Sequence, residues 1–445
     1  MTPFFSKVTE QFVVMWILEY IKDKIDFRQY GGSKGNSIAH YLIKFINFIL
    51  SKQDSHDQTA LLACMGDFSK AFNRQNHQIL ITKLCDLGLP GWLLRIVVAF
   101  LTDRKMIVRH KGKQSSVKSL PGGGPQGTLL GLLLFIVLIN DVGFEGQENN
   151  TGEIITSKKN MKTVNEMHLK YVDDLTLAES INLPAKTVYV PESERPLPDN
   201  FHAKTGHTFP VENSRVYQQL VDTKNYAKQN DMKINYKKSK LMLFNPCTAI
   251  DFIPDFELEK NQLEIVEEMK LLGIIIRSDL KWGSNTEYIV KKANSRLWTM
   301  RRLKNLGACD DDLLDVYTKQ IRSVLELAVP VWQSGLKQAQ KLEIERVQKS
   351  ALHIVLGKGY VSYKQALKTL NFESLEARRL KLCLKFAKKA ERHDKHKQWF
   401  KPNTMTVNTR QLKTKYCEVQ ARLSRFKDSP ISYLTNMLNE HYAKK

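Results

Sequence analysis

Two adjacent acids, Asp173 and Asp174, interrupt an alternating stretch, LKYVDDLTLAE (169–179), that is typical of a strand, a turn and a second strand. Neighbouring carboxylates raise one another's pKa unless a cation or strong hydrogen-bond donors lie close to them. An acidic turn in contact with water tolerates such a pair without any function. The pair therefore indicates chemistry only if other residues can share a cation with it.

A third acid, Asp67, ends a short apolar run, ALLACMGDF (60–68), that is typical of a strand. If this strand pairs with those around Asp173, the carboxylates converge at one edge of a sheet. Carboxylate oxygens are hard ligands of the kind that Mg²⁺ and Mn²⁺ prefer. Two such ions can clamp the attacking and leaving oxygens of a phosphoryl displacement. The three acids therefore predict a two-metal site.

A glycine-rich loop, PGGGPQG (121–127), stands between these acids in the chain. Consecutive glycines let a backbone approach a ligand without obstruction by Cβ atoms. Gln126 adds a donor and an acceptor at the same surface. Taken alone, the loop is equally well explained as a simple turn before the apolar run 128–140, which we expect to be a buried helix.

The elements that would position these residues fall into two parts. In the first part we expect helices at 7–25 and 37–51, a helix pair within 77–103 that breaks near Gly88, a hairpin at 105–120 that turns near Gly112, and strands at 232–245 and 269–282. A proline-containing stretch, 184–213, is typical of an exposed insertion or linker. Beyond Trp282 the pattern is almost wholly helical, at 286–306, 311–328, 338–356, 373–392 and, less regularly, 409–426. The pattern predicts a mixed α/β (α+β) part followed by an all-helical part.

The charge is distributed unevenly along the 445 residues, whose net charge is +22. Residues 281–445 hold 34 Lys and Arg against 15 Asp and Glu, so nearly all of the excess lies in the helical part. A strongly basic segment beside a near-neutral one favours a nucleic-acid partner, whose phosphates it would neutralise. A basic helical surface in contact with water alone is the other explanation.

Other features favour an intracellular protein, in the nucleus or the cytoplasm, with no membrane contact. The six cysteines show no CxxC pair and no zinc spacing, which fits a reducing compartment. No basic n-region follows Met1, so we expect no secretion. The longest apolar run, LLGLLLFIVLI (129–139), is about half as long as a membrane span requires.

The motifs, in their order along the chain, resemble those of the reverse transcriptases of non-LTR retrotransposons of the LINE type. They are DFSKAF (67–72), GGPQGTLLG (123–131), KYVDD (170–174), NYKKSK (235–240) and KLLGIII (270–276). QYGGSKGNSIAH (29–40) is similar to the glycine-rich fingers segment of that family. VYTKQIRSVLELAVPVW (316–332) and IERVQKSALHIVLG (344–357) resemble the helical thumb and the region after it. The resemblance covers nearly the whole chain.

The resemblance implies a right-hand polymerase with an antiparallel palm sheet. Incomplete fingers and the palm would occupy residues 1–282, a helical thumb 283–350, and a basic helical extension 351–445. The implied activity is RNA-directed DNA polymerisation: deoxynucleotides are added to a primer 3′-OH on an RNA template, with two Mg²⁺ or Mn²⁺ ions. A cationic Arg-Pro segment of the family would lie upstream of Met1, so the chain would correspond to an amino-terminally truncated enzyme.

The resemblance also implies roles for the acids and their neighbours. Asp67 and Asp173 would be metal ligands, and Asp174 would be the adjacent acid of the catalytic turn. The carbonyl of Phe68 would contact one ion. Lys238 would lie near the leaving pyrophosphate.

Further roles belong to residues that would touch the nucleic acid or the nucleotide. Phe72 stands at the position of the gate that excludes a ribose 2′-OH. The glycine loop would contact template and incoming nucleotide through Gly124, Gln126 and Gly127, and the primer end would be gripped by Leu272 and Gly273. At Gly124 the family more commonly has a branched residue.

Three other functions fit some of these observations. A catalytically inactive relic of such a polymerase would still bind nucleic acid through its basic part. A fragment without complete fingers would expose the apolar face of the helix at 7–25 and fold poorly. A nuclease could use the same acids, but it has no need of a PQG loop or a gate residue.

Overall fold

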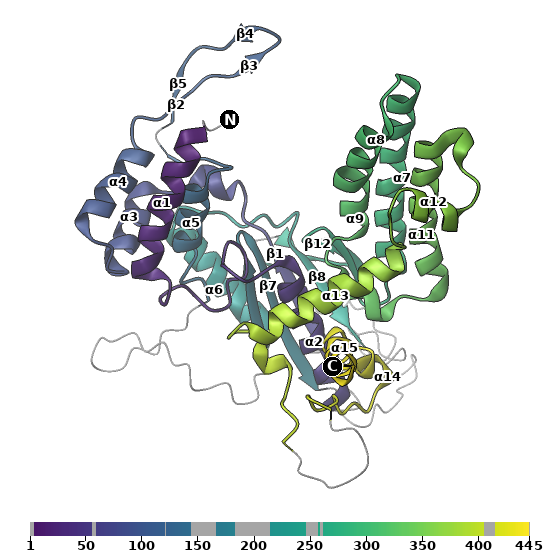
Figure 1. The fold of residues 1–445 in the computed structure, drawn as a ribbon. Coiled ribbons are helices and arrows are strands. Elements are labelled where there is room, and N and C mark those ends of the chain that lie inside the picture. Colours follow the sequence, from purple (N-terminus) through teal and green to yellow (C-terminus); the bar gives the residue numbers. More distant parts are fainter. Residues whose placement is uncertain are drawn as a thin grey trace, which may run out of the picture. The chain divides into compact units, whose positions relative to one another are not determined.

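The computed structural model describes residues 4–55, 59–120, 122–143, 166–182, 214–245, 257–258, 261–404 and 414–444 (Figure 1). The chain forms two compact units. The first consists of Met1–Ser37, Leu61–Leu243 and Cys247–Ile265, and the second of Ile38–Ala60, Phe244–Pro246 and Val266–Lys445. The division into fingers with palm, thumb and extension at residues 282 and 350 stays a prediction.

A five-stranded sheet is the centre of the first unit, with strand order β11-β8-β1-β7-β6. Its strands are β1 (Thr59–Gly66), β6 (Glu166–Tyr171), β7 (Asp174–Asn182), β8 (Lys240–Phe244) and β11 (Glu264–Ile265). β6 and β7 form the predicted antiparallel hairpin, whereas the two-residue β11 lies parallel to β8 at the opposite edge. β1 is buried along almost its whole length, as its apolar sequence predicts.

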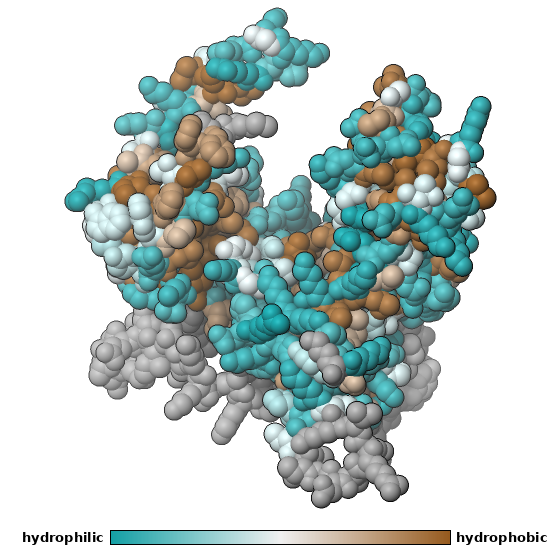
Figure 2. Space-filling view, in the orientation of Figure 1, coloured by the Kyte–Doolittle hydropathy of each residue, from teal (hydrophilic) through white to brown (hydrophobic). Residues whose placement is uncertain are grey.

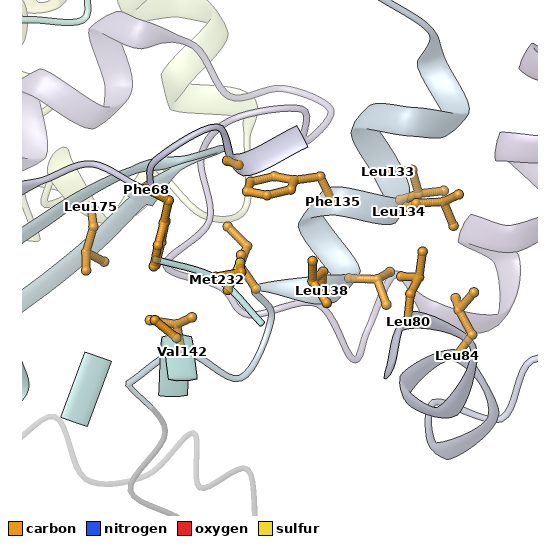
Figure 3. Packing of buried hydrophobic residues seen from close by; sticks show 14 of the residues in the cluster. Phe68, Leu80, Leu84, Leu133, Leu134, Phe135, Leu138, Val142, Leu175 and Met232 are labelled. Carbon is orange, nitrogen blue, oxygen red and sulfur yellow. The ribbon is translucent and has the colours of Figure 1, made fainter. Parts of the chain in front are cut away.

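Helices surround this sheet and share one apolar core with it. They are α1 (Phe4–Ile21), the 3₁₀ turn η1 (Ala71–Arg74), α3 (His77–Asp86), α4 (Gly91–Leu101), α5 (Leu129–Leu138) and α6 (Arg215–Gln229). α5 is apolar on every side and is therefore buried. Figure 3 shows its leucines, including Leu134 and Leu138, beside Leu80 and Leu84 of α3, in the same cluster as Phe68. This core fixes α5 directly behind the glycine loop.

The predicted hairpin at 105–120 is confirmed. It consists of β2 (Lys105–Met106), β3 (Arg109–His110), β4 (Lys113–Gln114) and β5 (Lys118–Ser119), and its tip is the turn Lys111–Gly112. Both turn residues have positive φ angles, 45° and 78°, as a tight two-residue hairpin turn requires. Figure 1 shows the hairpin projecting from the helices of its unit.

The second unit is mainly helical. Its helices are α2 (Ile38–Ser55), α7 (Gly283–Asn305), α8 (Asp310–Val316), the π-helical turn η4 (Tyr317–Arg322), α9 (Ser323–Leu325), α10 (Val329–Trp332), α11 (Gln338–Leu356), α12 (Tyr363–Thr369), α13 (Leu375–Arg392), α14 (Ser424–Lys427) and α15 (Pro430–Ala443), with 3₁₀ turns η5 (Gln333–Gly335), η6 (Gly357–Gly359) and η7 (Lys397–Trp399). A hairpin of β12 (Glu268–Leu271) and β13 (Ile274–Arg277) precedes α7. The remaining two strands, β9 (Glu257–Leu258) and β10 (Asn261–Gln262), pair with each other in the first unit.

Most predicted elements are confirmed, and two are wrong. Residues 232–239 contain no strand, because this segment makes a single bridge at Ile234 and then turns. In the helix expected at 409–426, residues 409–413 lie outside the described residues, residues 414–423 are not helical, and the short α14 begins only at Ser424. The expected linker at 184–213 lies outside the described residues. Among the helices of the described part, none has both the length and the apolar character needed to cross a membrane.

Two stacked histidines of the second unit, His40 and His396, predict a loss of stability in acid. Their rings are buried, with centroids 4.0 Å apart. Burial, together with neighbouring cationic groups, lowers the pKa of His40 to about 3 and that of His396 to about 2.

Below pH 6.5 the unfolded chain therefore binds protons that the folded chain excludes, so stability falls as pH falls. We expect each histidine to lower the free energy of unfolding by about 2 kcal/mol between about pH 6.5 and pH 5. Urea unfolding at both pH values measures this. His396→Phe should remove about half of the loss, and an equal loss in the variant and the wild type would contradict the assignment.

Candidate active site

The acid pair lies in the two-residue turn that joins β6 to β7. Tyr171 pairs with Asp174, which leaves Val172 and Asp173 as the turn. Val172 has a φ of 58°, a left-handed conformation that is unfavourable for a β-branched residue. Other contacts must hold the turn in this shape.

The glycine-rich segment that follows α1 supplies those contacts. The side-chain oxygen of Gln29 accepts hydrogen bonds from the backbone N–H groups of Val172 and Gly31, both at 3.0 Å. A Cβ atom on Gly31 would lie 2.5 Å from Cγ2 of Val172 and 2.6 Å from its backbone nitrogen. Glycine at position 31 thus lets this segment lie directly against the turn.

Lys170, three residues before Asp173, fixes β6 to neighbouring segments of the domain. Its side chain is 1% exposed. Its ammonium contacts the Asp26 carboxylate at 2.7 Å and donates to the carbonyls of Ile139 and Asn140 at 3.1 and 2.8 Å. Burial lowers the pKa of Lys170 to about 8, against the opposing effect of Asp26. The strand that carries the acids is therefore fixed to the end of α5.

Asp67, the third acid, follows β1 and is held from the segment before β8. The side-chain amide of Asn235 donates to its carboxylate at 3.1 Å, and the ammonium of Lys238 lies 3.3 Å from it. The backbone N–H of Asn235 also bonds to the Asp67 carbonyl at 2.7 Å, and the Asn235 carbonyl accepts from Lys238 and Ser239. Because residues 235–239 turn here, both Asn235 and Lys238 reach the acid.

The three carboxylates lie within electrostatic reach of one another. Partial burial, followed by the charges of Asp173 and Asp67, raises the pKa of Asp174 to about 6, while Lys238 opposes the shift. The pKa of Asp173 is also raised, chiefly by burial and then by Asp67. The Lys238 side chain is 72% exposed and compensates only part of this negative charge.

The donor set fits divalent cations, because it consists of hard carboxylate oxygens with an excess of negative charge. Across the described ranges, however, no three His, Cys, Asp or Glu side chains are spaced as a ready-made metal centre. Asp67 is directed towards Lys238 and Asn235 instead. The structure thus places the three predicted acids in one neighbourhood without a common coordination sphere.

The glycine loop is held by the segment that follows Asp67. The N–H of Gly123 donates to the carbonyl of Gln75 at 3.0 Å, and the N–H of Gly124 donates to that of Phe72 at 2.7 Å. The Gly123 carbonyl accepts from Arg104 at 2.5 Å and, in the Nε2-protonated tautomer, from His77 at 2.9 Å. Asp67 and the loop are therefore positioned by one short stretch of chain, 67–77.

The predicted gate and the end of the loop lie beside these contacts. Phe72 stacks on Phe135 of α5, with ring centroids 4.7 Å apart. Gln126 and Gly127 are exposed, and Gly127 has a φ of 83°. Phe68 is buried in the core next to Asp67.

The presence of glycine at position 124 is explained by its neighbour Gln75, which the sequence did not indicate. A Cβ atom on Gly124 would lie 2.2 Å from the side-chain oxygen of Gln75, which is 1% exposed. Within the described part of the chain, neither amide atom of Gln75 has a hydrogen-bond partner. Gln75 thus fills the volume that a branched residue at position 124 would occupy.

The predicted primer grip belongs to the second unit. Leu272 and Gly273 form the two-residue turn between β12 and β13, with φ angles of 50° and 86°. The range 269–282, expected to be a strand, thus contains a tight turn that divides it into two strands.

The comparison with known families identifies the first part of the chain. Residues 1–189 match the family described as reverse transcriptase (RNA-dependent DNA polymerase). This part of the chain is a reverse transcriptase domain. The predicted mixed α/β class of a right-hand polymerase is confirmed with it, and reverse transcriptases as a family use divalent metal ions.

Relatives from mobile elements confirm the resemblance to non-LTR retrotransposon reverse transcriptases. The chain is 23% identical over 306 residues to a probable RNA-directed DNA polymerase from transposon BS of Drosophila melanogaster, covering 67% of this chain and 29% of that protein. It is also 23% identical over 306 residues to the RNA-directed DNA polymerase from mobile element jockey of Drosophila funebris, covering 68% and 29%. The chain thus spans less than a third of the length of these relatives.

Among solved structures, a telomerase from Candida tropicalis matches with a TM-score of 0.41 and 12% identity, covering 99% of this chain and 54% of that one.

The sequence did not identify the residues that hold the candidate site in place. These are Gln29, Gln75, His77, Lys170 and Asn235. Three of them lie inside or beside motifs that were singled out, so their position in the chain was a usable signal. Their partners, however, are set only by the folded structure.

The raised pKa values of the acid pair predict a gain in stability when one charge is removed. Asp174→Asn should raise the free energy of unfolding by about 1 to 3 kcal/mol at neutral pH, and Asp173→Asn should raise it as well, because each relieves repulsion and burial of a carboxylate. Urea unfolding in the presence of EDTA measures this. A loss of stability in both variants would show that the carboxylates are instead held by favourable contacts.

The packing of Gln75 against Gly124 predicts a double-mutant rescue. Gly124→Val alone should destabilise the domain by about 1 to 3 kcal/mol, because the new side chain overlaps Gln75. Gln75→Ala should remove most of that loss in the double variant. Thermal unfolding of both single variants and the double variant gives the coupling energy, and additive effects would contradict the proposed overlap.

Proposed function

We propose that this protein is an RNA-directed DNA polymerase that adds deoxynucleotides to a primer 3′-OH on an RNA template. The observation that carries the proposal is the gathering of Asp67, Asp173 and Asp174, which lie in the part of the chain that matches the reverse transcriptase family, with Lys238. Because the chain spans only part of its relatives, its activity is inferred from the site.

Two Mg²⁺ or Mn²⁺ ions would be held by Asp67 and Asp173, with Asp174 and the Phe68 carbonyl beside them, and would stabilise the charge that develops on the transferred phosphoryl group. The protein's own task is then to position its substrates. Lys238 is mostly exposed and lies 3.3 Å from Asp67, so its ammonium is available to the leaving pyrophosphate.

The loop and the gate would select the substrate. Glycines 123 and 124 are buried against the segment 67–77 and would hold the loop in position, and exposed Gln126 and Gly127 would contact template and nucleotide. Phe72 is fixed by its stacking on Phe135. A rigid aromatic ring at this position would exclude a ribose 2′-OH.

The other residues and segments of the chain are assigned roles in the same proposed reaction. Leu272 and Gly273 would grip the primer end, the helices of 283–350 would act as a thumb, and the basic residues of 351–445 would bind heteroduplex phosphates. Fingers and palm would be contained in 1–282. An RNA template and deoxynucleoside triphosphates place the reaction inside the cell, in the nucleus or cytoplasm.

Primer extension tests the proposal directly. Purified protein, poly(rA) primed with oligo(dT), labelled dTTP and Mg²⁺ or Mn²⁺ should give incorporation that Asp173→Asn and Asp174→Asn each lower on the order of 100-fold. The loss should occur although both variants are at least as stable as the wild type. Unchanged heteroduplex binding in the same variants serves as the control.

Absence of incorporation by the wild type, with heteroduplex binding intact, would overturn the proposal. It would favour the inactive nucleic-acid-binding relic instead. Incorporation that persists in both variants would separate polymerisation from the acid pair.

A further inference from the structure

The hairpin of residues 104–120, called the basic arm below, is exposed along its whole length. Every residue from 105 to 119 is exposed, and Figure 2 shows hydrophilic side chains covering its tip. No Asp or Glu lies between positions 104 and 119, whereas six cations do: Arg104, Lys105, Arg109, Lys111, Lys113 and Lys118. The arm is therefore a one-sign surface.

The arm is a twisted two-stranded ribbon. Lys105 is opposite Ser119 near its base, and Arg109 is opposite Gln114 near its tip. Between these pairs, residues 107–108 face residues 115–117, so the returning strand has one extra residue, which increases local twist. A ribbon of this kind is only marginally stable alone in water, and a bound partner would stabilise it.

The charge of the arm selects the chemistry of that partner. Rows of Lys and Arg without acids are complementary to phosphates, whose neutralisation releases counterions. The competing explanation is that these cations keep an exposed edge from pairing with other chains. Cations that only protect an exposed edge could do so at any place on the surface of the protein.

The position of the arm argues for a partner at the active site. Its first residue, Arg104, donates to the Gly123 carbonyl at 2.5 Å, and Leu120 donates to the Arg104 carbonyl at 2.8 Å. The chain then enters the glycine loop directly. A nucleic-acid strand that contacts the loop therefore has the base of the arm beside it.

We propose that the basic arm binds the unpaired RNA template through its phosphates as the template approaches the glycine loop. This inference rests on the proposed function, because the strand that meets the loop before pairing with a nucleotide is the template. Each side of the arm is about eight residues long, or roughly 25 Å, which is enough to contact several phosphates. Contacts of this kind position the strand without reading its sequence.

The test compares two variants that each lose one Arg and two Lys. Arg109→Gln, Lys113→Gln and Lys118→Gln neutralise the arm, and Lys22→Gln, Arg95→Gln and Lys228→Gln neutralise exposed cations elsewhere in the same unit. Fluorescence anisotropy over a range of salt concentrations measures binding to a primed heteroduplex with a long 5′ RNA overhang and to the same duplex with blunt ends.

For the overhang substrate, the arm variant should bind about tenfold more weakly, and the magnitude of its salt slope should fall by about two, as expected for three lost phosphate contacts on a single strand. Its binding to the blunt duplex should match the wild type. The control variant should show no difference between the two substrates.

Equal weakening on both substrates would overturn the inference, because the arm would then hold duplex. No weakening on either would show that the cations only protect an exposed edge. Repeating the measurement with Asp173→Asn separates this inference from the proposed function, since binding does not require polymerisation. Overhang binding that depends on the arm, in a protein that incorporates no nucleotide, would support the arm while overturning the polymerase.

Discussion

The buried ammonium of Lys170 is the contact on which the geometry of the site depends. A lysine has three N–H donors, and here they meet the Asp26 carboxylate and the carbonyls of Ile139 and Asn140. One side chain thereby joins the strand before the acid turn, the segment after α1 and the end of α5. Removing one partner of a buried pair leaves an uncompensated charge and costs about 3–5 kcal/mol. Because Lys170 is almost completely buried, water does not compete for these contacts.

Such a joint is needed because the acid turn is unfavourable in itself. Val172 has a left-handed backbone, and Asp173 and Asp174 have raised pKa values. Both features oppose folding locally, and such features persist only where the surroundings over-determine the conformation. Gln29 supplies that support at the turn itself. The turn is thus held by contacts from outside it, while the acids keep an excess of negative charge for ligands.

The sequence predicted those elements whose cause lies in adjacent residues. The all-apolar α5, the hairpin turn at Gly112 and the helix break near Gly88 each follow from a local pattern. The pairing of Lys170 with Asp26 does not, because the two residues are 144 positions apart and a lysine in a strand is usually expected to face water. The strand expected over 232–245 was wrong in its first part, 232–239, for a related reason, whereas β8 confirms the rest. The alternation of residue types over 232–239 is compatible with a turn as well as with a strand. The hydrogen bonds between Asn235 and Asp67 hold the segment as a turn.

One short segment of the chain positions both the glycine loop and Asp67. Asp67 begins the segment whose later residues, Phe72, Gln75 and His77, hold Gly123 and Gly124. The placement of Asp67 relative to the glycine loop is therefore set within eleven consecutive residues, 67–77. Because Arg104 shares the Gly123 carbonyl with His77, the base of the basic arm is bonded to the same part of the glycine loop as this segment. The acid turn is held separately, by Gln29 and Lys170.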